Sequence, residues 1–110
     1  MPASPVDLLQ GTVDVLILRT LSWQPMHGYG VSKFIRERSE GTLNVESAAL
    51  YQALHRLARK RWIRAEWGVS DNNRRARYYH LTPEGRRQLR HEEASWRAYV
   101  DAVFKVLDPA

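Results

Sequence analysis

Residues 47–82, SAALYQALHRLARKRWIRAEWGVSDNNRRARYYHLT, contain a polar-faced helix followed by a basic β-hairpin. At 100° per residue, Leu50, Leu54 and Leu57 fall on one side of a helix predicted over residues 47–61, so they point towards a core. The other side is either an ordinary solvated face or one built to approach a negatively charged partner. Its side chains are those of Ala48, Gln52, His55 and Arg59, flanked by Tyr51 and Arg56.

The hairpin is predicted from an alternation of residue types. Apolar side chains occupy every second position from Ile63 to Val69, which is the period of a half-buried strand. A polar turn follows at residues 70–73, and a second strand is predicted over Tyr78–Leu81. The tip of this hairpin is basic, because three arginines precede the second strand: Arg74, Arg75 and Arg77.

Two further helices are predicted upstream. The first begins after Pro5 and ends at about Leu21, and the second covers Val31–Arg38. Residues 26–30, MHGYG, indicate a tight turn between them, in which His27 is a turn or helix-start residue rather than a catalytic one. Their inner faces are predicted to be Leu9, Val13, Leu16, Ile17 and Leu21, then Val31, Phe34 and Ile35.

This order of elements is that of a winged helix-turn-helix, a mainly α fold with a small antiparallel β-hairpin. A long last helix follows, since Thr82-Pro83-Glu84 supplies a capping hydroxyl, a first-turn proline and a first-turn acid, and the next breaker is Asp108-Pro109. We expect a winged unit over residues 1–82 and a dimerisation helix over residues 83–110. The apolar stripe that would meet a second copy is formed by Leu89, Trp96, Val100, Val103 and Leu107.

The positive charge is concentrated in one part of the chain. The 110 residues carry a formal net charge of +5, yet residues 55–77 alone hold eight arginines and lysines against two acids. The rest of the chain is therefore close to neutral. A local basic surface suits a polyanion, most simply the phosphate backbone of a nucleic acid, with acidic lipid and acidic protein as the other interpretations.

Several classes of protein are excluded. The chain has no cysteine, so disulfides, thiolate metal sites and cysteine nucleophiles are ruled out. His55, His80 and His91 are too scattered for a ligand set, and no serine has the surroundings of a nucleophile, so we expect no enzyme, no metal and no cofactor. Since no apolar run approaches the roughly 20 residues of a membrane span and no signal-peptide pattern is present, a soluble cytoplasmic protein is predicted. A nucleic-acid partner would associate it with the nucleoid.

Five segments in order resemble the PadR family of bacterial transcriptional regulators. They are Leu9–Asp14 (LQGTVD), His27–Gly30 (HGYG), Leu50–Leu57 (LYQALHRL), Arg74–Thr82 (RRARYYHLT) and Glu84-Gly85. The resemblance implies a winged helix-turn-helix that dimerises through its C-terminal helix. It also implies repression of transcription, often relieved by an aromatic or other small effector. The chain is similar to the short branch of the family, which has a single C-terminal helix.

The chain departs from the family at the start of the polar-faced helix. Members commonly carry glycine and then threonine or serine where this chain has Ala48-Ala49, and proline where it has Gln52. The missing hydroxyl puts phosphate contacts at these two alanines in doubt. Gln52 instead supplies an amide suited to the N6 and N7 edge of adenine.

These arguments predict a site for double-stranded DNA, with a pseudo-palindromic operator. Gln52 and His55 are expected to read base edges. Tyr51, Arg56 and Arg59 are expected to anchor phosphates, and Ser47 belongs to the same DNA-binding face. The wing residues Arg74, Arg75 and Arg77 are expected to meet phosphate or the minor groove.

Other interpretations stay open beside this one. The basic face could belong to a winged-helix module that binds an acidic protein. Trp96 is either a dimer anchor or one wall of a slot for a flat aromatic effector. The other three tryptophans, Trp23, Trp62 and Trp67, are predicted to pack in the core or at the domain edge.

Overall fold

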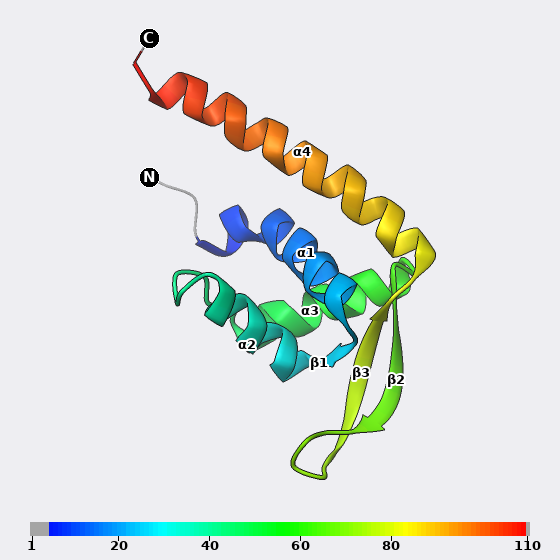
Figure 1. Ribbon diagram of the computed structural model, residues 1–110. Helices are drawn as coiled ribbons and strands as arrows, with labels where there is room; N and C mark the ends of the chain where they lie inside the picture. The colour runs from blue at the N-terminus through cyan, green and yellow to red at the C-terminus, as the bar shows by residue number, and fades with distance from the viewer. Residues whose placement is uncertain (1–4, 110) are drawn as a thin grey trace.

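The structure is a computed structural model that describes residues 5–109, with side chains from residue 11 onwards (Figure 1). The fold is mainly helical, with a small antiparallel sheet and a long C-terminal helix, so the predicted fold class is confirmed. The elements in chain order are α1 (Pro5–Trp23), β1 (Met26–His27), α2 (Gly28–Arg38), α3 (Ser47–Arg59), β2 (Ile63–Val69), β3 (Arg75–Leu81) and α4 (Pro83–Leu107).

The core lies where the first three helices meet. Ile17 and Leu18 of α1, Val31 of α2, and Leu54 and Leu57 of α3 are fully buried together. The inward leucine face of α3 is therefore confirmed. Full burial of such a side chain contributes roughly 1.5–3 kcal/mol, and this packing fixes which face of α3 is left for solvent.

The predicted inner faces of α1 and α2 are largely confirmed. Val13 and Leu21 are buried, whereas Leu16 and Phe34 are partly exposed. The prediction for Leu9 lies outside the side chains that the structure describes. Helix α1 ends at Trp23, which is largely exposed rather than packed.

A short strand stands where the sequence predicts only a turn. Met26 and His27 form β1, which pairs antiparallel with Tyr79 and Tyr78 of β3, so the sheet has the order β1-β3-β2. The predicted hairpin is thus two strands of a three-stranded sheet. The sequence of Met26 and His27 alone does not predict a strand, because the hydrogen bonds that make them one come from a segment about fifty residues further along the chain.

The two glycines of this segment belong to helix α2, which corrects the predicted turn. His27 is the N-cap of α2, and its Nδ1 accepts a hydrogen bond of 2.9 Å from the Gly30 N–H, as a helix-start residue should. A Cβ at Gly28 would lie 2.7 Å from the hydroxyl oxygen of Tyr51. Gly28 is therefore needed for the close approach of α3, not for a turn.

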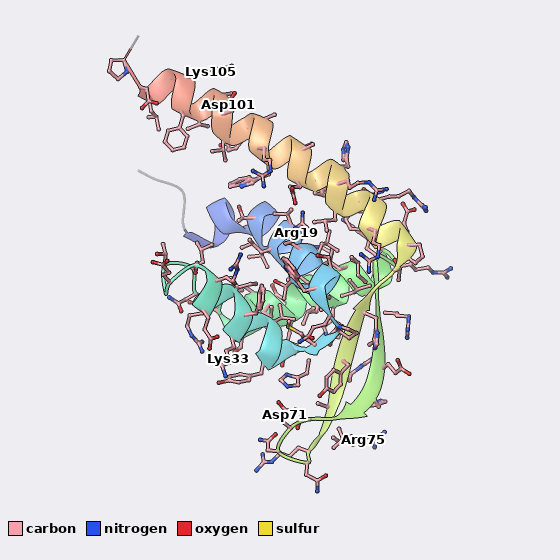
Figure 2. All side chains as sticks on the ribbon, viewed as in Figure 1. Arg19, Lys33, Asp71, Arg75, Asp101 and Lys105 are labelled. Carbon is pink, nitrogen blue, oxygen red and sulfur yellow. The ribbon has the colours of Figure 1, made fainter. Side chains whose placement is uncertain are left out.

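The wing, made of β2, the turn after it and β3, projects away from the helices (Figure 1). Strand β3 begins at Arg75, earlier than the predicted Tyr78, so two of the wing arginines lie in a strand rather than at the tip. Ile63 is buried at the base, but Trp67 is 56% exposed because no core lies beneath the outer wing. The sequence predicts Trp67 in the core or at the domain edge, and the first of these two placements is wrong. Figure 2 shows Asp71 and Arg75 at the far end of the wing.

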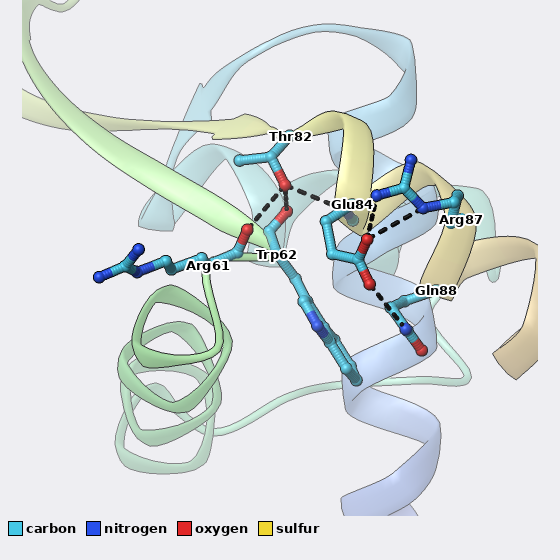
Figure 3. A network of polar contacts seen from close by, with 7 residues as sticks. Arg61, Trp62, Thr82, Glu84, Arg87 and Gln88 are labelled. Carbon is cyan, nitrogen blue, oxygen red and sulfur yellow. Dashed lines mark hydrogen bonds and ion pairs between the residues drawn. The ribbon is translucent and has the colours of Figure 1, made fainter.

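The start of α4 is fixed to the end of α3 as well as to the wing (Figure 3). Thr82 caps α4, since its hydroxyl oxygen accepts a 3.0 Å hydrogen bond from the Gly85 N–H, and Pro83 follows as predicted. The Thr82 hydroxyl also lies 2.8 Å and 2.9 Å from the carbonyl oxygens of Arg61 and Trp62. A Cβ at Gly85 would lie 2.0 Å from the Trp62 carbonyl oxygen, so only glycine fits this junction.

Glu84, in the first turn of α4, is held by its own helix (Figure 3). A hydrogen bond from Gln88 and then one from Arg87 lower the pKa of the Glu84 carboxyl. A carboxylate in the first turn also interacts favourably with the positive end of the helix dipole. The predicted start of the last helix is thereby confirmed.

Helix α4 packs on α1 along its first half and then runs past it (Figure 1). Leu89 is 5% exposed and belongs to the core of its own chain, so it has no surface to offer a second copy. Its prediction as a dimer-interface residue is revised on that ground. Arg19 of α1 lies 2.5 Å from Glu93, an ion pair that holds the two helices together beside Leu89.

Candidate nucleic-acid interface

The exposed side of α3 is the one that the sequence predicts. Four of its residues are Tyr51, Gln52, His55 and Arg59, and Ser47 is exposed in its first turn. Because Leu50, Leu54 and Leu57 anchor the opposite side in the core, this face has a fixed orientation. The helix presents hydroxyl, amide, imidazole and guanidinium groups to solvent.

Arg56 is placed differently from the prediction. Its guanidinium Nη2 lies 2.6 Å from a carboxylate oxygen of Asp14 on α1, and both side chains are largely covered. This partly buried pair holds the flank of α3 against α1. Arg56 thus positions the helix, and its phosphate contact stays a prediction.

The end of α3 determines where the wing begins. The helix stops at Arg59, and Arg61 adopts a left-handed conformation with φ of 63°. The Trp62 N–H then donates to the Leu57 carbonyl oxygen at 3.1 Å, and β2 starts at the next residue. The helix thus ends two residues earlier than predicted. The reversal of the chain at Arg61 places the wing beside the exposed face of α3.

An open groove of about 800 Å³ separates α3 from the wing and from the start of α2. Tyr51 and His55 line it from α3, while Arg75 and Arg77 line it from β3. The residues that the sequence predicts on two separate segments therefore share one concave surface. Gln52 and Arg59 lie on α3 but outside the lining of the groove.

Helix α2 supplies two groove residues that the sequence analysis missed. Tyr29, which is 64% exposed, stacks on His27 with ring centroids 6.4 Å apart, and Lys33 follows one turn later. Figure 2 shows Lys33 on the solvent side of α2. The sequence assigned Tyr29 to a turn and began the helix at Val31, so it gave no helical face on which Tyr29 and Lys33 would line up.

The wing presents two chemically different faces. On the groove side, the guanidinium carbons of Arg75 and Arg77 lie 4.4 Å and 5.6 Å from the centre of the Trp67 ring. On the other side, Oε2 of Glu66 lies 3.2 Å from Nη1 of Arg64 and 3.2 Å from Nε2 of His80. The acid of the wing strands is therefore paired away from the groove.

The groove-side cations have no acidic partner in the described part of the chain. Neither Arg75 nor Arg77 forms an ion pair there, and Arg74 at the turn forms none either. Tyr79 also lines the groove, and burial raises the pKa of its phenol although the charge of Arg77 opposes this. Asp71 is the one acidic residue of the described lining, beside four arginines and lysines, so the concavity is cationic with aromatic walls.

The far half of α4 carries a second exposed surface, of apolar character. Trp96, Tyr99 and Phe104 are exposed, and Val100 and Val103 are partly covered. With α1 this face forms an open groove of about 470 Å³, in which Trp96, Val100 and Phe104 lie opposite Val15 and Leu16. Leu107 extends the predicted stripe to the end of the helix and is 68% exposed.

The sequence and the geometry can now be compared with known proteins. Residues 17–91 match the family described as "Transcriptional regulator PadR-like family". The chain belongs to this family. A protein of Lysinibacillus sphaericus, described as uncharacterized protein X, is 33% identical to the PadR-like chain over 91 residues, which cover 82% of this chain and 83% of that protein.

Solved structures of PadR-like proteins share the fold. A transcriptional regulator from Clostridium thermocellum has a TM-score of 0.84 and 28% identity, covering 93% of this chain and 99% of that one. A PadR family transcriptional regulator from Eggerthella lenta has a TM-score of 0.78 and 31% identity, covering 94% and 88%. The family and these structures agree on a DNA-binding transcriptional regulator rather than an enzyme.

No helix within residues 5–109 is both long enough and apolar enough to span a membrane. Among the side chains described, none of the His, Asp and Glu residues cluster in threes at distances that would hold a metal ion.

Proposed function

We propose that this PadR-like protein is a homodimeric repressor that binds a pseudo-palindromic operator with the exposed face of α3 and the wing. The observation that carries the proposal is the shared groove, in which α3 side chains face wing arginines that have no acidic partner among the described side chains. A rigid helix beside a cationic strand pair suits the major groove and its flanking phosphates.

In this proposal each residue has a distinct role. Gln52 and His55 read base edges in the major groove, because an amide and an imidazole offer directional donors and acceptors. Three groups of α3 bind phosphates, from Ser47, Tyr51 and Arg59. The wing contributes Arg74, Arg75 and Arg77, whose charges bind without regard to sequence.

The apolar half of α4 supports the homodimer. A second copy of α4 would cover Trp96, Val100, Val103 and Leu107, and it would bring two α3 helices to the spacing of successive major grooves. In this arrangement residues 83–110, which contain α4 (Pro83–Leu107), are a dimerisation element appended to a winged unit over residues 1–82.

The repressor is proposed to respond to a small aromatic effector at Trp96. Trp96 lines the groove between α1 and α4, and its ring lies 5.8 Å from that of Tyr99. A flat ligand held there would shift the population towards a dimer whose α3 helices no longer match both half-sites. Such a regulator would act in the cytoplasm, on the nucleoid.

The direct test is a fluorescence-anisotropy titration, at several salt concentrations, that measures binding of the protein to the DNA upstream of its own gene. We expect tight binding that distinguishes this duplex from a scrambled one and that weakens steeply with salt. Weak binding to both duplexes that vanishes at physiological salt would contradict the proposal and favour the acidic protein partner. A planar aromatic compound should quench Trp96 fluorescence and release the DNA, and a Trp96→Phe variant is the control.

A further inference from the structure

Trp67 has a position on the wing that burial does not explain. It is 56% exposed, and the outer wing has no core beneath it. An exposed indole is an unusual choice for such a strand, because it leaves a large apolar ring in water. Its neighbours in the structure are two guanidinium groups.

The register of the wing brings these neighbours onto the same face. Trp67 is directly opposite Arg77 in the β2–β3 ladder, and Arg75 is the next residue on that face towards the tip. The guanidinium carbon of Arg75 lies 4.4 Å from the ring centre, and that of Arg77 lies 5.6 Å from it. Both distances are within the range of a cation–π contact.

A guanidinium stacked on a ring keeps its binding capacity. The stack uses the flat face of the group, whereas its N–H donors lie in the plane and stay free for phosphate oxygens. A free arginine loses side-chain entropy when it binds, and a stacked one has lost part of it already. An indole in contact with two arginines therefore prepares both of them for a polyanion.

The wing does not depend on Trp67 for its shape. On the opposite face the Tyr78 ring covers Gly68, where a Cβ would lie 2.9 Å from it, and the Tyr78 hydroxyl donates to the Val69 carbonyl oxygen at 3.1 Å. The strands also pair over all seven residues of each. A change at position 67 should alter the arginines while the hairpin stays folded.

We propose that Trp67 is a positioning residue for DNA binding, which acts by holding Arg75 and Arg77 over its ring in the orientation that meets the phosphate backbone. This inference rests on the proposed function, and it adds a residue that contributes to affinity through its neighbours. Trp67 does not itself contact DNA in this account.

The test is a cycle of four proteins: wild type, Trp67→Leu, the pair Arg75→Gln with Arg77→Gln, and the triple variant. Each is titrated against the duplex from upstream of its own gene over a range of salt. Trp67→Leu should weaken binding about three- to tenfold when the arginines are present and leave affinity unchanged when they are absent. The salt slope should be retained in Trp67→Leu and become shallower by about two in the arginine pair.

Two controls accompany the cycle. Trp67→Phe keeps a ring for stacking and should recover most of the affinity. Trp23→Leu removes another exposed tryptophan, at the end of α1, and should bind as wild type does. Far-ultraviolet circular dichroism and thermal melting establish that every variant is folded.

The inference has outcomes that overturn it separately from the proposed function. An equal loss for Trp67→Leu with and without the arginines would mean that the indole contacts DNA itself, and no loss in either would mean that the arginines do not need it. The stack is also measurable without DNA, since the ring current of Trp67 should move the Arg75 side-chain protons upfield in the NMR spectrum. Arginine shifts that are the same in wild type and Trp67→Leu would overturn the inference even if no DNA were bound.

Discussion

The wing and the far half of α4 lie at opposite ends of the molecule (Figure 1), and each leaves uncovered a kind of side chain that folded proteins normally cover or pair. Within residues 11–109, the wing arginines Arg75 and Arg77 have no acidic partner and are held on an exposed ring. The far half of α4 presents Trp96, Tyr99 and Phe104, and its charged residues are paired, as in Lys105 with Asp101 at 3.5 Å.

The difference shows how the chemistry of an uncovered surface indicates its partner. An apolar stripe gains free energy when another apolar surface removes it from water, which suits a second copy of the same helix. A cationic face gains little from burial but releases counterions on meeting a polyanion. One chain thus carries two partner surfaces, an apolar one suited to a second copy and a cationic one suited to a polyanion.

The largest effect is expected at the junction that joins the two surfaces. Gly85→Ala would place a Cβ 2.0 Å from the Trp62 carbonyl oxygen, so α4 would have to move relative to the wing. We expect a loss of about 3 kcal/mol or more in the free energy of unfolding, measured by urea denaturation. Gly11→Ala, in a helix with open space at that Cβ, is the matched control and should be neutral or stabilising. Equal stability of the two variants would refute the tight junction.

The next prediction breaks the apolar surface alone. The double variant Val103→Asp with Leu107→Asp would bury two charges in the dimer interface. The dissociation constant of the dimer should therefore rise at least about 100-fold. Ala98→Asp, on the other side of α4, makes the same kind of change and should leave the dimer intact. Sedimentation equilibrium gives the masses. A dimer that persists in the double variant would show that α4 is not the interface.

A third prediction separates the recognition of bases from the electrostatic attraction to phosphates on the cationic surface. Gln52→Ala should cost about 1–3 kcal/mol against the specific duplex and nothing against a scrambled one. Arg59→Gln should weaken both duplexes alike and make the salt slope shallower by about one. Anisotropy titrations measure both quantities. An equal loss on both duplexes for Gln52→Ala would mean that this amide reads no base.

The smallest effect concerns the ion pair that holds α4 on α1. The hydrogen bond from Arg19 lowers the pKa of the Glu93 carboxyl below its ordinary value of 4.5, against the opposing effect of burial. A lowered pKa contributes stability that is fully present above pH 4.5 and is lost as the pH falls through the folded-state value. Because Arg19 is half exposed, the contribution is below about 1 kcal/mol.

Glu93→Gln should therefore melt slightly below wild type at neutral pH and match it in acid. Asp101→Asn breaks an ion pair within α4 that joins no second helix, and it serves as the control. A difference between wild type and Glu93→Gln that is as large in acid as at neutral pH would contradict the assigned cause.

Local signals in the sequence predict the parts of the fold that depend on near neighbours. The leucine face of α3 and the Thr82 cap of α4 follow from spacing and from a capping motif, and both are confirmed. Strand β1 does not follow, because Met26 and His27 are a strand only through pairing with β3. The role of Gly28 is also invisible in the sequence, since it depends on the approach of Tyr51 from another helix.

The candidate site also combines features that follow from local spacing with features that depend on distant segments. Periodicity places Gln52 and His55 on the exposed face of α3, but it does not reveal that Arg56 meets Asp14, which is 42 residues away. A heptad stripe likewise does not say which of its members the protein's own domain covers, and Leu89 is one of these. The sequence predicts Trp67 in the core or at the domain edge, because a strand pattern carries no information about where the core ends.

The most direct test of the two-surface account is sedimentation equilibrium of the protein with and without the duplex from upstream of its own gene. The account predicts twice the chain mass of 12.8 kDa for the free protein and two chains on one duplex in the complex. A single chain in solution and a single chain on the duplex would contradict it, since the apolar surface of α4 would then have no partner in either state.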